Sequence, residues 1–378
     1  MCRVNNINCN ERPGENEARL GLYYFLLKQY SERAILYLIY KKQTLRYVIR
    51  FFKPLSFLSR RLALNLNFDD MSIMVMGTVA LDDVKTPFGE RERVLGGSAS
   101  HFSMAASFLA PVKIVSIVGN DFPQEHLDYL SKRNIDVSGI AKSEEKTFHW
   151  KGHYEYDMNV AHTDETVLGV LTLFNPQLTD EQKKSPFLFL ANIDPEIQMK
   201  VLNQMENIAF AGLDSMNFWI ESKVDALWQV LKKVNVLFLN DAEIRELAGE
   251  SSLVKAAKKV QKSGPKIVLV KKGEHGVLAV TEDSVFVAAA YPTEDVIDPT
   301  GAGDSFAGGF VSYLYSQYQK SKENIFSNSV IRQAVIWGAS AASFCVEEFT
   351  TEGLEKATTD QIKSRCHDIL EFTAFEKH

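Results

Sequence analysis

The segment from Asp298 to Asp304 (Asp-Pro-Thr-Gly-Ala-Gly-Asp) places a carboxylate on each side of a turn of small residues. Apolar residues follow it at every fourth position from Phe306 to Leu314, a spacing that predicts a buried helix beginning near Gly303. Small residues before a helix let backbone N–H groups converge on a ligand, and the helix dipole favours an anion there. The residues predicted to frame this anion hole are Gly301, Ala302 and Gly303.

Asp304 places a carboxylate beside the same anion hole, where it would repel a bound phosphate. Phosphoryl transfer needs both groups: donors for the charge on the transferring phosphate, and an acceptor for the proton of the attacking hydroxyl. Asp304 is therefore predicted to be the catalytic base. The alternative is that Asp304 only occupies the favoured first turn of a helix. Gly308-Gly309 argues against a simple cap, because each glycine inside a helix costs roughly 1 kcal/mol and points to close packing against the sheet.

Two more loops follow buried strands. Asn240-Asp-Ala-Glu243 begins a helix, and Asn followed three residues later by Glu is a capping pattern. A functional interpretation is also open, in which Glu243 faces the crevice at the carboxyl end of the strand and orders the Mg²⁺ shell. The second loop runs from Lys271 to Gly276 and starts a hairpin; taken alone, it is a charged surface loop.

The elements that must position these residues begin at Ser72, where short apolar runs alternate with helical periods. The predicted strands include residues 73–76, 112–118, 187–190, 208–213, 236–239 and 267–270. Continuous apolar strands separated by helices predict an α/β fold with a mostly parallel sheet covered on both faces. Residues from about 137 to 176 lack helical periodicity and are predicted to form most of an antiparallel flap, or lid.

Composition excludes several classes of function. A net charge of −6 argues against general nucleic-acid binding, and no apolar run approaches the roughly 20 residues needed to cross a bilayer. No membrane partner is therefore expected. Four scattered cysteines are too few for a disulfide framework or a zinc site, which favours a reducing compartment and a cytoplasmic location.

The first part of the chain differs from the rest. Residues 1–70 contain 12 Lys/Arg and 6 Asp/Glu, whereas the remainder of the chain is acidic. This change in composition predicts an appendage outside the fold over residues 1–70 and a catalytic domain over residues 71–378. Membrane-surface helices built from the apolar and basic residues of the first segment are the alternative.

Residues 298–310 resemble the C-terminal signature of the ribokinase or PfkB family of carbohydrate and nucleoside kinases. The similarity covers the chain from about Ser72 to about Leu370. The resemblance implies a Rossmann-like sheet with a small β-sheet lid, ATP with Mg²⁺, frequent activation by a monovalent cation such as K⁺, and a homodimer formed through the lid. It also implies that Asp304 is the base and that Asp298 binds the monovalent cation. Independently, Pro299 restricts Asp298 to an extended conformation.

The resemblance assigns further residues to the two substrates. It places Asn240, Glu243, Lys272, Gly273 and Gly276 beside the nucleotide. It implies that Asp82, predicted to lie in a loop just beyond the first strand, grips sugar hydroxyls, with Asp83 as the alternative. It also implies that Gly96-Gly97 lets the acceptor approach the backbone.

Some positions depart from the family pattern and bear on the acceptor. The family commonly has Asn where this chain has His101, and its Asp-x-Asn-x-Arg pattern is only partly kept at Asp214-Ser-Met-Asn217-Phe-Trp219. The donor count of an imidazole changes with pH near its ordinary pKa of about 6.5, which predicts a pocket that prefers an acceptor other than ribose. The alternative is that His101 points into the core.

The predicted activity is ATP-dependent phosphorylation of a hydroxyl on a small sugar or sugar-like acceptor. A nucleoside kinase and a catalytically silent sugar- or nucleotide-binding regulator are the alternatives. A dinucleotide oxidoreductase is disfavoured because no Gly-x-Gly-x-x-Gly follows the first strand. A metal site at His149, His153 and His162 is also disfavoured, since strand geometry separates the first two by about 13 Å.

Overall fold

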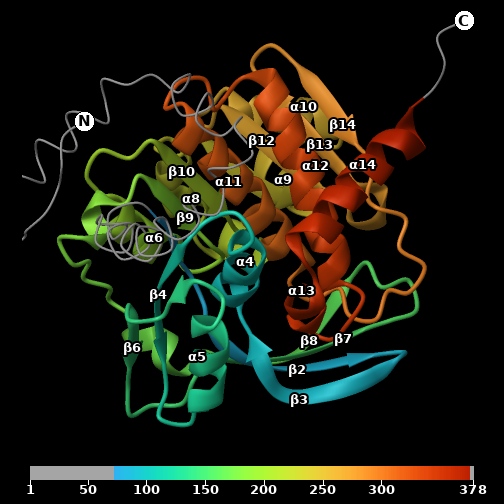
Figure 1. Cartoon of the computed structure of the whole chain (residues 1–378). Helices are drawn as coiled ribbons and strands as arrows, with labels where there is room; N and C mark the ends of the chain where they lie inside the picture. Colours follow the sequence, from blue (N-terminus) through green and yellow to red (C-terminus); the bar gives the residue numbers. More distant parts are fainter. Residues whose placement is uncertain (1–71, 375–378) are drawn as a thin grey trace, which may run out of the picture. The chain divides into compact units, whose positions relative to one another are not determined.

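The computed structural model of the chain describes residues 72–374, and the predicted appendage over residues 1–70 lies outside them. Two sheets form the framework of this part of the chain (Figure 1). The larger one runs in the order β14-β13-β12-β11-β10-β9-β1-β4-β5, with β6 also paired to β4. Its strands are β1 (Ile73–Met76), β4 (Val112–Val118), β5 (Ile135–Asp136), β6 (Ile140–Lys142), β9 (Phe187–Leu190), β10 (Phe210–Asp214), β11 (Val236–Asn240), β12 (Ile267–Lys271), β13 (Val277–Thr281) and β14 (Val285–Ala288).

Strands from β12 to β4 pair in parallel, and β13 and β14 add an antiparallel hairpin. This confirms the predicted mostly parallel sheet. The alternating side chains of β1 explain why helices cover both faces: Ile73 and Val75 enter one core, whereas Met74 and Met76 enter the other.

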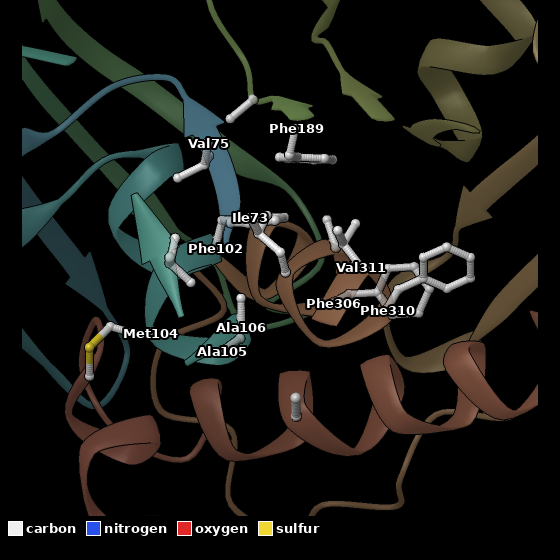
Figure 2. Close-up of a cluster of buried hydrophobic side chains, with 14 of the residues drawn as sticks. Ile73, Val75, Phe102, Met104, Ala105, Ala106, Phe189, Phe306, Phe310 and Val311 are labelled. Atoms are coloured by element: carbon white, nitrogen blue, oxygen red, sulfur yellow. The ribbon is translucent and has the colours of Figure 1, made fainter. Parts of the chain in front are cut away.

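The first core lies between the sheet and a layer of helices, to which α4 (Ser98–Ala106), α11 (Ala302–Lys320) and α12 (Asn328–Cys345) contribute most. Figure 2 shows Phe102 of α4 and Phe310 of α11 in this core, with Phe189 of the sheet. The Phe102 and Phe189 rings stack with centroids 4.2 Å apart. The second core packs the other face against α6 (Pro195–Leu202), α8 (Val224–Leu231), α9 (Asp241–Ala248) and α10 (Leu253–Gln261). The remaining helices are α5 (Gln124–Ser131), α7 (Asn217–Ser222), α13 (Glu352–Lys356) and α14 (Thr359–Thr373).

The two glycines inside α11 pack against helices and not, as predicted, against the sheet. A Cβ at Gly308 would overlap the carbonyl group of Phe102 in α4. A Cβ at Gly309 would lie 2.9 Å from the Cα of Gly338 in α12. These glycines therefore let α11 lie close to both neighbours, which brings its N-terminus over the edge of the sheet.

The smaller sheet, called the lid, runs in the order β3-β2-β7-β8. Its strands are β2 (Ala80–Thr86), β3 (Gly89–Gly96), β7 (His149–Tyr154) and β8 (Ala161–Val167). Half of the lid thus comes from residues 80–96, outside the segment of about 137–176 predicted to supply most of it. Within that segment, β6 joins the large sheet instead. Among the described residues, no helix is both long and apolar enough to cross a membrane.

Candidate active site

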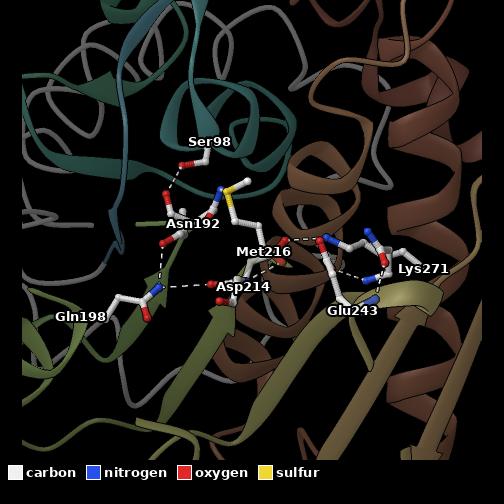
Figure 3. A network of polar contacts seen from close by, with 10 residues as sticks. Ser98, Asn192, Gln198, Asp214, Met216, Glu243 and Lys271 are labelled. Carbon is white, nitrogen blue, oxygen red and sulfur yellow. Dashed lines mark hydrogen bonds and ion pairs between the residues drawn. The ribbon is translucent and has the colours of Figure 1, made fainter. Parts of the chain in front are cut away.

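Three neighbouring parallel strands end in polar residues at one edge of the large sheet. The last residues of β10, β11 and β12 are Asp214, Asn240 and Lys271. Ligands of open α/β sheets bind at such carboxyl ends. Lys271 donates a hydrogen bond from Nζ to Asp214 Oδ2 over 2.6 Å, and the side chains are 18% and 3% exposed (Figure 3). Burial lowers the pKa of Lys271, but Asp214, Glu243 and Asp304 outweigh it and raise the pKa above its usual range.

The N-terminus of α11 reaches the same edge. Gly301 is the N-cap residue with φ 74°, a left-handed conformation that favours glycine. A Cβ at Gly301 would overlap the imidazole ring of His101, and a Cβ at Gly303 would lie 3.0 Å from Lys271 Nζ. Backbone N–H groups of this first turn are the ordinary donors of an anion site. The turn from Gly301 to Gly303 thus ends next to the Lys271 ammonium group.

Asp304 lies in the first turn of α11. Burial raises the pKa of its carboxyl group to about 8, with Asp214, Asp82 and Glu243 acting in the same direction and Lys271 in the opposite one. A carboxylate with so high a pKa is a stronger proton acceptor than an exposed one, which suits a general base. The structure therefore brings the predicted base beside the predicted anion hole.

Asn240 and Glu243 form a capping box at the start of α9. The Glu243 N–H donates to Asn240 Oδ1 over 2.8 Å, and the Asn240 N–H donates to Glu243 Oε2 over 2.7 Å. The predicted capping of this helix by Asn240 and Glu243 is therefore confirmed. Burial raises the pKa of Glu243 to about 7, and Lys271 and Asp214 are among the charges that act on it, so Glu243 also faces the active site.

The residues present are compatible with Mg²⁺ that arrives with a nucleotide. Among residues 72–374, no group of three His, Cys, Asp or Glu side chains is placed to hold a metal. Mg²⁺ usually keeps several waters and binds through one or two carboxylates plus substrate phosphates, so Glu243 is a sufficient protein partner. The lid histidines contact one another and acidic residues: the His153 and His162 rings stack with centroids 5.1 Å apart, and His149 Nε2 lies 3.2 Å from Asp83 Oδ1.

The predicted acceptor side is built by β2 and the N-terminus of α4. Asp82 lies within β2 of the lid and not in a loop. The Gly97 N–H donates to Asp82 Oδ2 over 3.3 Å, whereas Oδ1 is buried without a hydrogen-bond partner among the described residues. A Cβ at Gly96 would overlap the Asp82 carboxylate. Burial raises the pKa of Asp82 to about 7. Its free oxygen is available to a hydroxyl donor.

His101 lies in α4 and is fully buried against Gly301. Its Nδ1 is 3.9 Å from Cys345 Sγ, and its Nε2 has no hydrogen-bond partner among the described residues. Burial lowers the pKa of His101 to about 4, so the ring is neutral above pH 5. The predicted change of its donor count near pH 6.5 is therefore wrong.

Asp298 is buried and held by two loops. It accepts hydrogen bonds from the Thr300 N–H and the Thr350 N–H, each over 2.9 Å. The carbonyl oxygens of Thr300 and Thr350 both lie 3.5 Å from Cys345 Sγ. The two carbonyl groups thus converge on the Cys345 thiol, while the N–H groups of the same two threonines hold the Asp298 carboxylate.

The predicted nucleotide loop follows β12 and meets the lid. Gly273 has φ 54° and Gly276 has φ 80°, while the Lys272 N–H donates to the Gly276 carbonyl over 2.9 Å. Asn159, in the turn between β7 and β8, donates from Nδ2 to Glu274 Oε1 over 3.1 Å. The lid tip therefore contacts this loop.

Three residues lie in the site although no sequence pattern assigned them a role there. Lys271 and Asp214 form the buried ion pair, and Tyr154 lies 3.3 Å by its hydroxyl oxygen from Thr300 Oγ1. A signal was present for the first two, because each polar residue directly follows a buried apolar strand run. Lys272 was predicted to lie beside the nucleotide. Within residues 72–374, its side chain makes no hydrogen bond or ion pair with the site carboxylates.

Comparisons with known proteins agree with this geometry. The family model described as pfkB family carbohydrate kinase matches residues 63–357. A cytidine kinase from Thermococcus kodakarensis is 31% identical over 249 residues, covering 64% of this chain and 88% of that protein. A nucleoside kinase from Methanocaldococcus jannaschii is 24% identical over 254 residues, covering 67% of this chain and 79% of that protein.

Solved structures show the same ribokinase-like fold. The crystal structure of the Methanocaldococcus jannaschii nucleoside kinase, an archaeal member of the ribokinase family, superposes with a TM-score of 0.62 at 21% identity. It covers 79% of this chain and 98% of that one. A putative ribokinase II from E. coli in complex with ATP and Mg²⁺ superposes with a TM-score of 0.64 at 18% identity, covering 79% and 99%.

Proposed function

This chain belongs to the pfkB family of carbohydrate kinases, and from that premise we propose that it transfers the γ-phosphate of ATP to a hydroxyl of a nucleoside. The observation that carries the proposal is the position of Asp304, a half-buried carboxylate in the first turn of α11 beside the Gly301–Gly303 turn. A base and an anion site at one point are what phosphoryl transfer to a hydroxyl requires.

In the proposed reaction, Asp304 accepts the proton of the acceptor hydroxyl. The new bond joins the hydroxyl oxygen to the γ-phosphorus, and the electron pair of the broken bond leaves with ADP. The N–H groups of the Gly301–Gly303 turn stabilise the charge on the transferring group. Glu243 would hold Mg²⁺ through its water shell, and the ion would supply charge neutralisation when bound with ATP.

The lid supports the same proposal. Asn159 joins the lid tip to the nucleotide loop at Glu274, and Tyr154 lies against Thr300 beside the anion hole. Closure of such a lid would exclude water, which would otherwise compete with the acceptor hydroxyl. Asp298 and the carbonyl groups of Thr300 and Thr350 would bind a monovalent cation. We propose that this cation is K⁺ and that the protein acts in the cytoplasm.

The choice of a nucleoside over a free sugar rests on the similarity to a cytidine kinase and a nucleoside kinase. Both acceptor classes present hydroxyls to which the free Asp82 Oδ1 would be a strong charged acceptor. A free sugar, the expectation from the sequence, is therefore the second candidate.

The test is ADP release by the full-length protein with ATP and Mg²⁺, measured against a panel of nucleosides, free sugars and sugar phosphates. We expect a nucleoside to give the highest kcat/KM. The control is Asp304→Asn, which should bind a nonhydrolysable ATP analogue normally but lose about 10²- to 10⁴-fold in turnover. The proposal fails if no acceptor raises ADP release above the rate of Asp304→Asn.

A homodimer formed through the lid is a further part of the proposal. Apolar side chains on the lid are open to solvent, including Phe88 at 59% and Tyr156 at 91% exposure. Burying such side chains would favour association. Sedimentation of the parent and of Phe88→Ser/Tyr156→Ser should show a dimer converted to a monomer; a monomeric parent would refute it.

A further inference from the structure

Lys271 is a largely buried cation, and its position next to α11 is not required for its ion pair with Asp214. It ends β12, directly between Asp214 at the end of β10 and the first turn of α11. Its Nζ contacts Asp214 Oδ2 at 2.6 Å and lies 3.0 Å from the position of a Cβ on Gly303. An ammonium group therefore lies where the N–H groups of α11 would meet a phosphate.

The carboxyl groups around Lys271 would disfavour a bound phosphate if the Lys271 ammonium were absent. Asp214, Glu243 and Asp304 all act on Lys271, so the site holds three carboxyl groups and one ammonium. A phosphate approaching these carboxyl groups would be repelled by any that are ionised. The positive charge of the ammonium acts at a similar distance and with the opposite sign, so it offsets such a repulsion.

A purely structural role accounts poorly for this arrangement. Removing two charges from water costs several kcal/mol per ion, and apolar residues of similar volume often replace a buried pair without loss of stability. The Lys271–Asp214 pair is therefore expected to add little to the free energy of unfolding, because its attraction is offset by the desolvation of both charges. An ammonium with three donors, only one of which is used by Asp214, retains donors for a ligand.

We propose that the Lys271 ammonium donates a hydrogen bond to the transferring phosphoryl group, while Asp214 holds the ammonium in place. Lys271 is then a catalytic residue and Asp214 a positioning residue. Lys271 stays protonated throughout, because the proton of the acceptor hydroxyl goes to Asp304 and the bonding electrons of the broken P–O bond go to ADP. The inference rests on the proposed function and adds a protein cation to it.

The test compares full-length variants with the acceptor that the parent phosphorylates. The double variant Lys271→Met/Asp214→Asn removes both charges, so neither partner is left buried and unpaired. Asp214→Asn alone removes only the partner. Lys223→Met is the matched control, because Lys223 also pairs with carboxylates, Asp194 at 2.7 Å and Glu196 at 2.6 Å, at a surface site 31% exposed.

Three quantities are measured for each variant: kcat, the Kd of the nonhydrolysable analogue AMP-PNP with Mg²⁺ by calorimetry, and Tm. We expect the double variant to bind AMP-PNP within about fivefold of the parent and to lose about 10²- to 10³-fold in kcat, as when one oxyanion donor is removed. Asp214→Asn should retain at least a tenth of the parental kcat, and Lys223→Met should equal the parent within about twofold.

Two results would overturn the assignment. One is a double variant with kcat within about threefold of the parent, and the other is Asp214→Asn alone producing the whole loss. If the double variant does not fold, Lys271→Gln carries the test: a loss of about 10²-fold with AMP-PNP still bound supports the role, and parental kcat refutes it. A parent that phosphorylates no acceptor refutes the proposed function instead, before any variant is compared.

Discussion

Replacing Gly301 by alanine tests the geometry on which the anion hole depends. A left-handed φ of 74° costs a residue other than glycine about 1–2 kcal/mol. The new Cβ would also overlap the His101 ring, and overpacking a buried site typically costs about 1–3 kcal/mol more. Gly301→Ala should therefore lower the free energy of unfolding by about 2–5 kcal/mol. Displacement of the donors at the start of α11 should lower kcat by about 10²-fold.

Gly249 is the matched control for this change. It is the C-cap residue of α9 with φ 58°, and nothing lies within 4 Å of a Cβ built on it. Gly249→Ala should therefore show the backbone cost of about 1–2 kcal/mol without any steric cost. Its kcat should stay at the parental value.

The assay is a double-mutant cycle. The free energy of unfolding in urea and kcat are measured for the parent, Gly301→Ala, His101→Ala and the double variant. Removing the ring makes room for the new Cβ, so the two changes should be non-additive by about 1–3 kcal/mol. The reasoning is refuted if Gly301→Ala is no more destabilising than Gly249→Ala, or if the two changes simply add.

Four further outcomes are expected. Because Asp304 must be deprotonated to act and its pKa is raised to about 8, kcat/KM should fall tenfold per pH unit below about pH 8; a limb near pH 5 would assign the base elsewhere. K⁺ should raise turnover above that in a bulky organic cation at equal ionic strength, and Asp298→Asn should abolish the difference; equal rates in the parent would exclude the cation site. His101→Asn should change the ranking of acceptors by kcat/KM at nearly constant ATP KM, whereas an unchanged ranking with a lower Tm would leave His101 as a packing residue. A chain starting at Met71 should keep the Tm and activity of the full chain, and aggregation would show that residues 1–70 are structural.

Much of the fold was predictable because the apolar runs of the parallel strands are continuous. Residues 73–76, 112–118 and 187–190 were predicted with the bounds of β1, β4 and β9. The lid strands β2 and β3 were missed because they carry mostly polar side chains, from Asp82 to Lys85 and from Glu90 to Arg93. A strand without an apolar run cannot be distinguished from a loop by its sequence pattern. Only its pairing with neighbouring strands identifies it.

The active site was predictable where one segment holds several functional groups. Residues 298–304 contain the turn, the proposed base and Asp298 together, so their local spacing was informative. Lys271 and Asp214 are 57 positions apart, and only the parallel pairing of β10, β11 and β12 brings them together. The pKa of His101 was missed for a similar reason, since its burial against Gly301 depends on packing between α4 and α11.

The pairing of β2 with β7 has a consequence for how the chain folds. These strands are parallel neighbours, with Leu81 opposite His149, although β3, α4, β4, α5, β5 and β6 lie between them in sequence. Joining them closes a long loop, whose entropic cost is smallest once those intervening elements are already compact. We therefore expect the amides of β2 and β7 to gain protection from hydrogen exchange late in refolding, after those of β1 and β4. In the native protein the lid should then be a unit that opens by itself, without unfolding of the large sheet.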